Sequence, residues 1–268
     1  MQITNASIAG EFLEVSSEQR LGIMEILHNK KSNLSSLAKQ LDATAAEVHR
    51  NLGRLKEAGL IEKDGDGNYS LTMYGKIIYM QIPAFKFMIK NKKYFETHDF
   101  ADTSIKFMQR IGALAMSEQI TGYSKIAECW EEIYKNADKY IFNILIDVQY
   151  NEKILEILQN KLANKVNIQS IFSEKAIIPS KRQELLTRYD FSKHVKGELL
   201  KRKMSKESKI ALIMNEKEAG ICLPTINGET DMSKMFYGKD ELFHEWCRDF
   251  FVEEWSKSSA FQESKIKS

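Results

Sequence analysis

The sequence predicts an α/β protein, α+β overall, in which a helical N-terminal part precedes a larger C-terminal part of alternating helices and strands. Three observations favour this fold class. Between residues 17 and 58, apolar residues recur at helical spacing, and two short strand-like runs follow around a Gly-rich turn within residues 60–72. Beyond residue 105, helical segments alternate with apolar strand-like runs. We therefore expect an N-terminal domain over residues 1–95 and a C-terminal domain over residues 96–268.

The composition is that of a globular protein, with 43% hydrophobic and 28% charged residues in a chain of 268. A chain of this length can bury more than one core. No apolar run approaches the roughly 20 residues that span a bilayer, and the first residues lack the pattern of a secretion signal. We expect a cytoplasmic protein without a membrane partner. Cys129, Cys222 and Cys247 lie far apart and predict reduced thiols, and we expect no metal ion and no cofactor.

The charge is distributed unevenly along the chain. The net charge is +2, and residues 1–93 hold 13 Lys and Arg against 10 Asp and Glu, so the positive excess is N-terminal. The basic cluster at residues 201–209 can contact phosphate, but we favour its interpretation as a solvated face between two elements. This cluster consists of Lys201, Arg202, Lys203, Lys206 and Lys209.

Three helices are expected in the first domain. The first follows Ser17, a residue type that caps helix N-termini, and the second covers residues 34–41. The third begins after Thr44, where Glu47 stands three residues on, as in a capping box. Two short helices joined by a tight turn form a helix-turn-helix, whose second helix fits a major groove. The runs at residues 60–63 and 69–72 predict a hairpin after it, which is the wing of a winged helix-turn-helix.

The stretch LSSLAKQLDATAAEVHRNLGRLKEAGLIEKDGDGNYSLTMYGK resembles the winged helix of ArsR-type and related archaeal transcription regulators. The resemblance covers residues 17–80 and follows the order of the motifs. These are a Leu-Ala pair in the second helix, a recognition helix, the exit Leu-x-x-Ala-Gly-Leu-Ile, a Gly-rich tip and Tyr-x-Leu-Thr-x-x-Gly. The resemblance implies a DNA-binding scaffold, although winged helices also serve protein–protein contacts.

The third helix is expected to contact DNA. Val48, Leu52 and Leu55 form its buried stripe, so its other side is expected to face DNA. Arg50 can read a guanine edge or grip phosphate, and small residues at the helix start allow a close approach to the bases. The alternative is a solvated helix face, and two Asp residues at the hairpin tip weigh against strong phosphate contact there. The candidate DNA-binding residues are Ser35, Ser36, Thr44, Ala45, Ala46, His49, Arg50, Arg54, Lys63 and Asn68.

Residues 73–90 carry apolar side chains at helical spacing, and Pro83 must kink or end a helix there. This apolar face can form the seam of a homodimer or pack on its own domain, and the sequence does not decide between the two. Dimerisation is expected on functional grounds, because one short recognition helix reads few bases.

Strand-like and helical runs alternate in the second domain. Helices are expected at residues 105–114, 127–137, 154–164 and 240–255, and strands at 139–148, 165–174, 208–215 and 219–226. The apolar side of the last helix is expected to cover a sheet. Trp130, Tyr134 and Tyr140 lie near the first strand, where an α/β layer often binds a ligand, although core packing is the more common role of such aromatics.

The resemblance extends into this domain. His-Asp-Phe at residues 98–100, Leu-Pro-x-x-x-Gly-x-x-Asp at 223–231 and Phe-x-x-Trp-Cys-x-x-Phe-Phe at 243–251 resemble regulators of the methanogenesis-filament-regulator type. That family implies a regulatory domain resembling a degenerate phospholipase-D-like fold, distantly similar to the effector domain of TrmB-type sugar-responsive regulators. A phosphodiesterase would need His-x-Lys followed by Asp. His194 and Lys196 begin that pattern, but Lys201 stands at the Asp position, so we expect no catalytic residues.

The sequence as a whole predicts a transcription regulator and not an enzyme. We expect sequence-specific binding of double-stranded DNA by a homodimer that responds to a small-molecule effector. Two alternatives remain open: a winged-helix protein–protein adaptor and a phospholipase-D-like phosphodiesterase.

Overall fold

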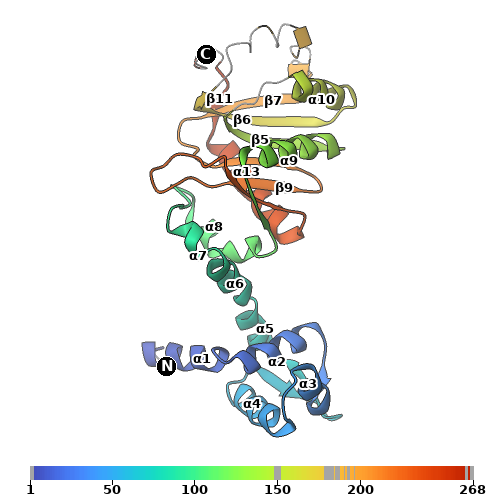
Figure 1. The fold of residues 1–268 in the computed structure, drawn as a ribbon, viewed down its shortest axis with the longest axis vertical. Coiled ribbons are helices and arrows are strands. Elements are labelled where there is room, and N and C mark those ends of the chain that lie inside the picture. Colours follow the sequence, from blue (N-terminus) through green and yellow to red (C-terminus); the bar gives the residue numbers. More distant parts are fainter. Residues whose placement is uncertain are drawn as a thin grey trace. The chain divides into compact units, whose positions relative to one another are not determined.

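The computed structural model of the chain describes residues 3–147, 152–177, 184, 188–189, 191, 194–195, 197–262 and 265. The chain divides into two compact units, Met1–Pro83 and Ala84–Ser268 (Figure 1). The division comes earlier than the boundary expected after residue 95. Phe87 and Tyr94 pack in the core of the second unit, with ring centroids 5.3 and 5.0 Å from that of Phe236. Residues 84–95 are therefore part of the second unit.

The first unit contains the three expected helices and the expected hairpin. It also contains a helix, α1, that the sequence does not predict, and a short strand, β1, that joins the hairpin in an antiparallel sheet of order β1-β3-β2. The elements are α1 (Asn5–Val15), α2 (Glu18–Asn29), β1 (Ser32–Asn33), α3 (Leu34–Gln40), α4 (Ala45–Glu57), β2 (Ile61–Lys63), β3 (Asn68–Leu71) and α5 (Met73–Tyr79).

Side-chain caps fix the starts of these helices, as the sequence predicts. The Ser17 hydroxyl accepts a hydrogen bond from the N–H of Arg20 at the start of α2. At the start of α4, the Thr44 N–H donates to Glu47 over 3.0 Å and the Glu47 N–H donates to the Thr44 hydroxyl over 3.2 Å, which confirms the capping box. The helices and the hairpin then share one apolar core, whose fully buried members include Ile23, Met24, Leu37, Leu52 and Leu55.

Arg20 joins α1 to α2. Its guanidinium donates to the carbonyl oxygens of Leu13 and Glu14 over 2.6 Å each, which satisfies carbonyl groups at the end of α1. No residue of α1 is buried. The helix is therefore held at its C-terminal end, and its apolar residues Ile8, Phe12 and Leu13 remain exposed.

The expected connector is two helices and not one. α5 ends at Tyr79, and α6 (Ile82–Lys90) begins just before Pro83. Proline is tolerated in the first turn of a helix because the N–H that it lacks has no partner there. Pro83 therefore starts the second helix, and this confirms that the helical run is broken near this residue.

The second unit is built on a sheet that, within the described residues, has eight strands in the order β11-β7-β6-β5-β8-β9-β10-β4. β5, β6 and β7 are parallel, and the other neighbours are antiparallel. The remaining elements are α7 (Lys92–Phe95), α8 (Ile105–Gln109), a 3-10 helix (Ile111–Leu114), β4 (Glu118–Thr121), α9 (Tyr123–Asn136), β5 (Tyr140–Asp147), α10 (Glu152–Ala163), β6 (Asn167–Ile177), β7 (Leu200–Ser205), β8 (Ala211–Asn215), β9 (Ala219–Cys222), β10 (Lys234–Gly238), α13 (Glu241–Lys257) and β11 (Ser259–Ala260).

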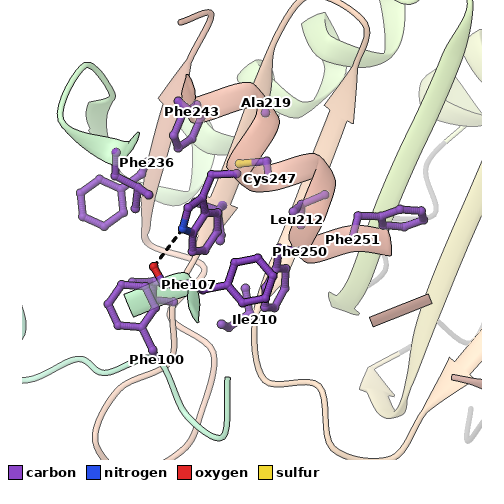
Figure 2. Packing of buried hydrophobic residues seen from close by; sticks show 14 of the residues in the cluster. Phe100, Phe107, Ile210, Leu212, Ala219, Phe236, Phe243, Cys247, Phe250 and Phe251 are labelled. Atoms are coloured by element: carbon purple, nitrogen blue, oxygen red, sulfur yellow. Dashed lines mark hydrogen bonds between the residues drawn. The ribbon is translucent and has the colours of Figure 1, made fainter. Parts of the chain in front are cut away.

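Each face of this sheet carries its own apolar core, because side chains alternate between the faces along each strand. In β8, Ala211 and Ile213 pack under α9 and α10, whereas Leu212 and Met214 pack against α13. The core on the α13 side is rich in aromatic rings (Figure 2). Its Trp246 donates a hydrogen bond from Nε1 to the carbonyl oxygen of Phe107 over 3.1 Å, drawn as the dashed line.

The basic cluster at residues 201–209 differs from its expected role. Residues 201–203 lie within strand β7, so the interpretation as a face between two elements is wrong for them. The Nζ of Lys203 donates to the Trp255 carbonyl oxygen over 2.6 Å and lies 4.9 Å from the centre of that ring. The guanidinium of Arg202 lies 4.2 Å from the centre of the Phe261 ring. The aliphatic stems of these residues therefore serve as packing surface, which a charge pattern conceals.

Two of the motif segments in the second unit meet in the fold. His98 is buried, and its Nε2 lies 2.9 Å from Oδ2 of Asp231. The other carboxylate oxygen of Asp231 accepts from the N–H of Ser233 over 2.8 Å. Burial alone would raise the pKa of Asp231, but the hydrogen bonds from Ser233 and His98 lower it further than burial raises it. The pair ties the segment before α8 to the loop after β9.

Among the residues described, no helix is long and apolar enough to cross a bilayer. Likewise, no three His, Cys, Asp or Glu side chains of the described ranges gather as potential metal ligands. Cys222 and Cys247 are buried free thiols, as expected, and Cys129 is a half-buried one.

Candidate nucleic-acid interface

The exposed face of α4 is small and carries one cation at its centre. Val48, Leu52 and Leu55 are buried. At about 100° per residue, Ala46, Arg50 and Gly53 lie on the opposite side of the helix, and all three are exposed. The space beside Gly53 is open, since a Cβ built there would meet no atom within 4 Å. A flat surface with a single long cation allows close approach of a partner.

Arg50 is the most available cation on this face. It forms no hydrogen bond and no salt bridge within the described part of the chain. Its charge helps to lower the pKa of Glu47, although the main cause is the pair of hydrogen bonds between that carboxylate and Thr44. The Arg50 guanidinium therefore keeps its fork of donors for a partner.

Arg54 is engaged within the first unit. Its Nε and Nη2 donate to the Glu14 carboxylate over 3.1 and 2.5 Å. This bidentate contact raises the pKa of Arg54 and holds its side chain toward α1. DNA contact by Arg54 stays a prediction, and it would require the guanidinium to leave Glu14. The sequence pattern does not indicate α1, so it gives no sign that Glu14 competes with DNA for Arg54.

The start of α4 presents exposed small residues. Ala45, Ala46 and His49 are exposed, and His49 stands on the flank of the helix. The Thr44 hydroxyl is already used, because it donates to Glu47 over 2.8 Å and accepts from the N–H of that residue. Thr44 is thus a cap first, and phosphate contact by its hydroxyl stays a prediction.

The start of α3 is capped by a residue that the sequence analysis does not predict. Asn33 accepts from the N–H of Ser36 over 2.9 Å through its side-chain oxygen. The Ser36 hydroxyl bonds the side chain of Gln40, 3.0 Å away, whereas Ser35 is exposed. Of the two serines, Ser35 is the freer candidate for phosphate.

Asp64 organises the hairpin tip. Its carboxylate accepts from the N–H groups of Asp66 and Asn68 over 3.1 and 2.9 Å, and these bonds together with Lys31 lower its pKa. The aliphatic end of the Lys63 side chain lies near Gly67, and its ammonium is 5.5 Å from the centre of the Tyr69 ring. The tip thus combines carboxylates with one exposed lysine, so contact with phosphate by Lys63 and Asn68 stays a prediction.

Asn51 is a further polar residue of α4 that helical periodicity misses. It is buried on the inner face, and its Nδ2 donates to the Gln19 side chain of α2 over 2.6 Å. The bond fixes the rotation of α4 relative to α2. It therefore positions the exposed face without touching a partner.

The residues of the incomplete His-x-Lys-Asp pattern do not form a phosphodiesterase site within the described part of the chain. His194 is half-buried, and Lys196 lies outside the described residues. Lys201, at the position where Asp is needed, lies in β7 and is 3.6 Å from the Glu198 carboxylate. Nothing within the described ranges therefore assembles the His-x-Lys-Asp arrangement.

Comparison with known proteins gives one family match. Residues 11–92 match the model of the HVO_A0261 N-terminal domain, which covers α1 from its middle onward, the whole hairpin and the helices up to α6. A search of curated proteins finds no match.

Several solved structures are similar to the chain at low identity. TrmBL2, described as an archaeal chromatin protein with a novel mode of DNA binding, is 11% identical over 94% of this chain and 98% of its own, with a TM-score of 0.41. NucT from Helicobacter pylori is 8% identical over 54% of this chain and 98% of its own, with a TM-score of 0.41. The phospholipase D family member Nuc from Salmonella typhimurium is 11% identical over 55% of this chain and 99% of its own, with a TM-score of 0.40. These scores are too low to carry a functional argument.

Proposed function

We propose that the protein is a sequence-specific transcription regulator that binds double-stranded DNA through a winged helix-turn-helix. In this proposal α3 and α4 are the helix-turn-helix, the β2–β3 hairpin is the wing, and α4 enters the major groove. One observation carries the proposal: the exposed face of α4 places Arg50 between the small residues Ala46 and Gly53. Arg50 can then form a bidentate contact with a guanine edge.

The N-termini of α3 and α4 also support this assignment. The first N–H groups of a helix lack partners within the helix and attract phosphate oxygens. The starts of α3 and α4 carry Ser35 and Ala45, exposed residues that leave room for a DNA backbone. In the proposal these contacts set the position of the domain, and Arg50 supplies base recognition.

We further propose that the protein acts as a homodimer. Helix α5 exposes Met73, Ile77 and Met80, with exposed fractions of 71%, 52% and 66%. These side chains lie on the side of α5 opposite Gly75, which is buried against Leu60. Two recognition helices on a palindromic site read about twice as many bases as one, so a dimer gives the specificity that a regulator needs.

The second unit takes the role of a regulatory domain in this proposal. A ligand that binds one arrangement of the dimer more tightly than another would change the spacing of the α4 helices and hence the affinity for DNA.

Fluorescence anisotropy of the full chain tests the DNA-binding proposal. The labelled duplex carries the DNA upstream of the chain's own gene, and the control duplex has the same composition in scrambled order. We expect tighter binding to the upstream duplex and affinity for both duplexes that falls as salt rises, because phosphate contacts release counterions. Equal affinity for the two duplexes at every salt concentration would contradict the proposal and favour the adaptor.

A further inference from the structure

A cavity of about 110 Å³ lies in the second unit between the sheet and the helices α9 and α10. Most of its lining is apolar, with Ile126 from α9, Leu158 from α10 and Leu145 from β5 among the contributors. For comparison, an engineered apolar cavity of about 150 Å³ holds benzene. The cavity therefore suits a compact molecule of about one ring.

A row of polar residues crosses the sheet at this cavity. Asn143 of β5 pairs with Ser170 of β6, and Ser170 pairs with Arg202 of β7. All three residues line the cavity. The rows two residues away on the same face are apolar and consist of Ile141, Ile168 and Leu200 on one side and Leu145, Phe172 and Met204 on the other.

Two buried polar atoms of the lining residues have no hydrogen-bond partner within the described part of the chain. They are Nε1 of Trp130, a donor, and Oδ1 of Asn143, an acceptor. Trp130 is 7% exposed and Asn143 is 2% exposed. The Asn143 amide nitrogen donates to the Tyr134 hydroxyl over 3.3 Å, so the carboxamide oxygen is the group left unmatched.

Two comparable groups of the same unit are satisfied, whereas the buried Tyr94 hydroxyl also has no partner among the described residues. On the opposite face of the sheet, Trp246 Nε1 donates to the Phe107 carbonyl oxygen. The amide of the fully buried Asn215 donates to the Ile133 carbonyl oxygen and accepts from the N–H groups of Lys217 and Glu218. Unmatched buried polar atoms destabilise a fold, and native proteins rarely keep them without a reason. Trp130 and Asn143 both line the cavity.

We propose that this cavity binds a small neutral molecule of about one ring, whose polar group accepts from Trp130 Nε1 and donates to Asn143 Oδ1. A hydroxyl group is the simplest chemistry that does both. The lining is mostly apolar, and its one charged residue, Arg202, has its guanidinium 4.2 Å from the centre of the Phe261 ring, so the cavity favours an uncharged molecule, because a buried charge would lose its hydration. The ligand class is therefore a phenol-like or small cyclic alcohol.

In this proposal the cavity holds the ligand to which the regulator of the proposed function responds. Ligand binding itself does not depend on the proposed function, and only an effect of the ligand on DNA binding does. Ligand binding is measured on the full chain without DNA. A failure of ligand binding would therefore leave the DNA proposal in place, and a failure of DNA binding would leave the cavity proposal in place.

Phenol and toluene are the probes, because they have nearly the same shape and differ by the hydroxyl group. Isothermal titration calorimetry and the shift in melting temperature measure their binding. We expect phenol to bind at least about ten times more tightly than toluene, since a site built for a hydroxyl rejects the analogue that lacks it. Equal affinity of the two probes, or no binding of either, would overturn the proposal.

Asn143→Leu separates recognition from stability. Leucine has nearly the shape of asparagine and removes the unmatched oxygen, so the melting temperature of the empty protein is expected to stay the same or rise. The preference for phenol over toluene is expected to disappear. An Asn143→Leu protein that folds and still prefers phenol tenfold would contradict the assigned contact.

Trp130→Phe and Trp246→Phe form a matched pair on opposite faces of the sheet. Trp130→Phe removes an unmatched donor and is expected to weaken phenol binding at least about fivefold, as for the loss of one hydrogen bond. Trp246→Phe breaks the bond to Phe107, so it is expected to lower the melting temperature and leave phenol affinity unchanged. If Trp246→Phe weakened phenol binding as much as Trp130→Phe, the effect would be one of general stability and the assignment would fail.

Discussion

Gly75 of α5 packs against the backbone of Leu60. A Cβ built at this position would lie 1.9 Å from the Leu60 carbonyl oxygen, a backbone atom that cannot rotate away. The N–H of Thr72 donates to the same oxygen over 3.1 Å, so moving Leu60 would also disturb the start of α5. The glycine of the sequence motif Tyr-x-Leu-Thr-x-x-Gly is therefore required by packing.

Gly75→Ala is expected to lower the free energy of unfolding of the first unit by at least about 2 kcal/mol, because the clash outweighs the higher helix propensity of alanine. Gly53→Ala is the matched control. Its Cβ meets open space on α4, and the variant is expected to be more stable by about 0.5–1 kcal/mol. Urea unfolding of both variants checks the pair, and a Gly75→Ala protein as stable as the wild type would refute the close approach.

Glu253 of α13 has a pKa well below the usual range of a glutamate. It accepts hydrogen bonds from Lys106, Lys257 and Ser104. Burial raises its pKa, but these three bonds lower it more, to about 2. Because the pKa in the folded state lies below that in the unfolded state, the carboxylate stabilises the fold fully above the unfolded pKa. This contribution is lost as the pH falls toward 2.

Glu253→Gln is therefore expected to lower the urea midpoint at pH 7, and the difference from the wild type is expected to shrink between about pH 5 and pH 3. Glu245→Gln is the control, since this carboxylate is 59% exposed and lies 4.0 Å from Arg110. A difference at Glu253 that stays constant over this pH range would show that the carboxylate has an ordinary pKa in the folded protein.

At the scale of elements, the sequence predicts the helices and strands whose inner side is apolar. The capping box, the hairpin and α13 follow from residue types at fixed spacing. Four strands of the second unit are not predicted: β4, β7, β10 and β11. In β7, Leu200, Arg202 and Met204 face one side, and lysines face the other, so charges hide the alternation. Tertiary contacts of the long basic side chains determine the conformation of this segment, and residue spacing alone does not reveal these contacts.

The sequence also predicts only part of the candidate interface, because some of its contacts depend on residues that are brought together by the fold. The position of Arg50 on the exposed face of α4 follows from helical periodicity and is confirmed as exposed. The contact of Arg54 with Glu14 depends on α1, which lies 40 residues away in the sequence and buries no residue of its own. The cap at Asn33 and the inner bond of Asn51 involve polar residues whose partners only the fold brings near.

The exposed apolar side of α5 gives a prediction for assembly. Ile77→Glu is expected to raise the dimer dissociation constant at least about tenfold, because a carboxylate would be buried in an apolar contact. Val252→Glu makes the same change at an exposed apolar residue of α13 and is expected to leave assembly unchanged. Sedimentation equilibrium checks both variants. A wild-type chain that is monomeric at every concentration would contradict the proposed dimer.

At the scale of the whole molecule, the two units have separate tasks in the proposed function. The first unit presents an exposed recognition surface with its cap and core residues held by hydrogen bonds. The second unit encloses a cavity beside two unmatched polar groups. Both assignments follow from the same physical test, in which a polar group is either satisfied within the chain or available to a partner. The central claim is that Arg50 is available to DNA.

The most direct measurement of this claim is the ratio of dissociation constants for scrambled and upstream duplexes, compared between Arg50→Ala and Lys125→Ala. Both variants remove one positive charge, and Lys125 is an exposed residue of α9 in the second unit. We expect Arg50→Ala to reduce the ratio by about five- to 150-fold, since a lost bidentate base contact costs about 1–3 kcal/mol of discrimination. Lys125→Ala is expected to leave the ratio unchanged. An unchanged ratio in Arg50→Ala, with the wild type discriminating between the duplexes, would contradict the account.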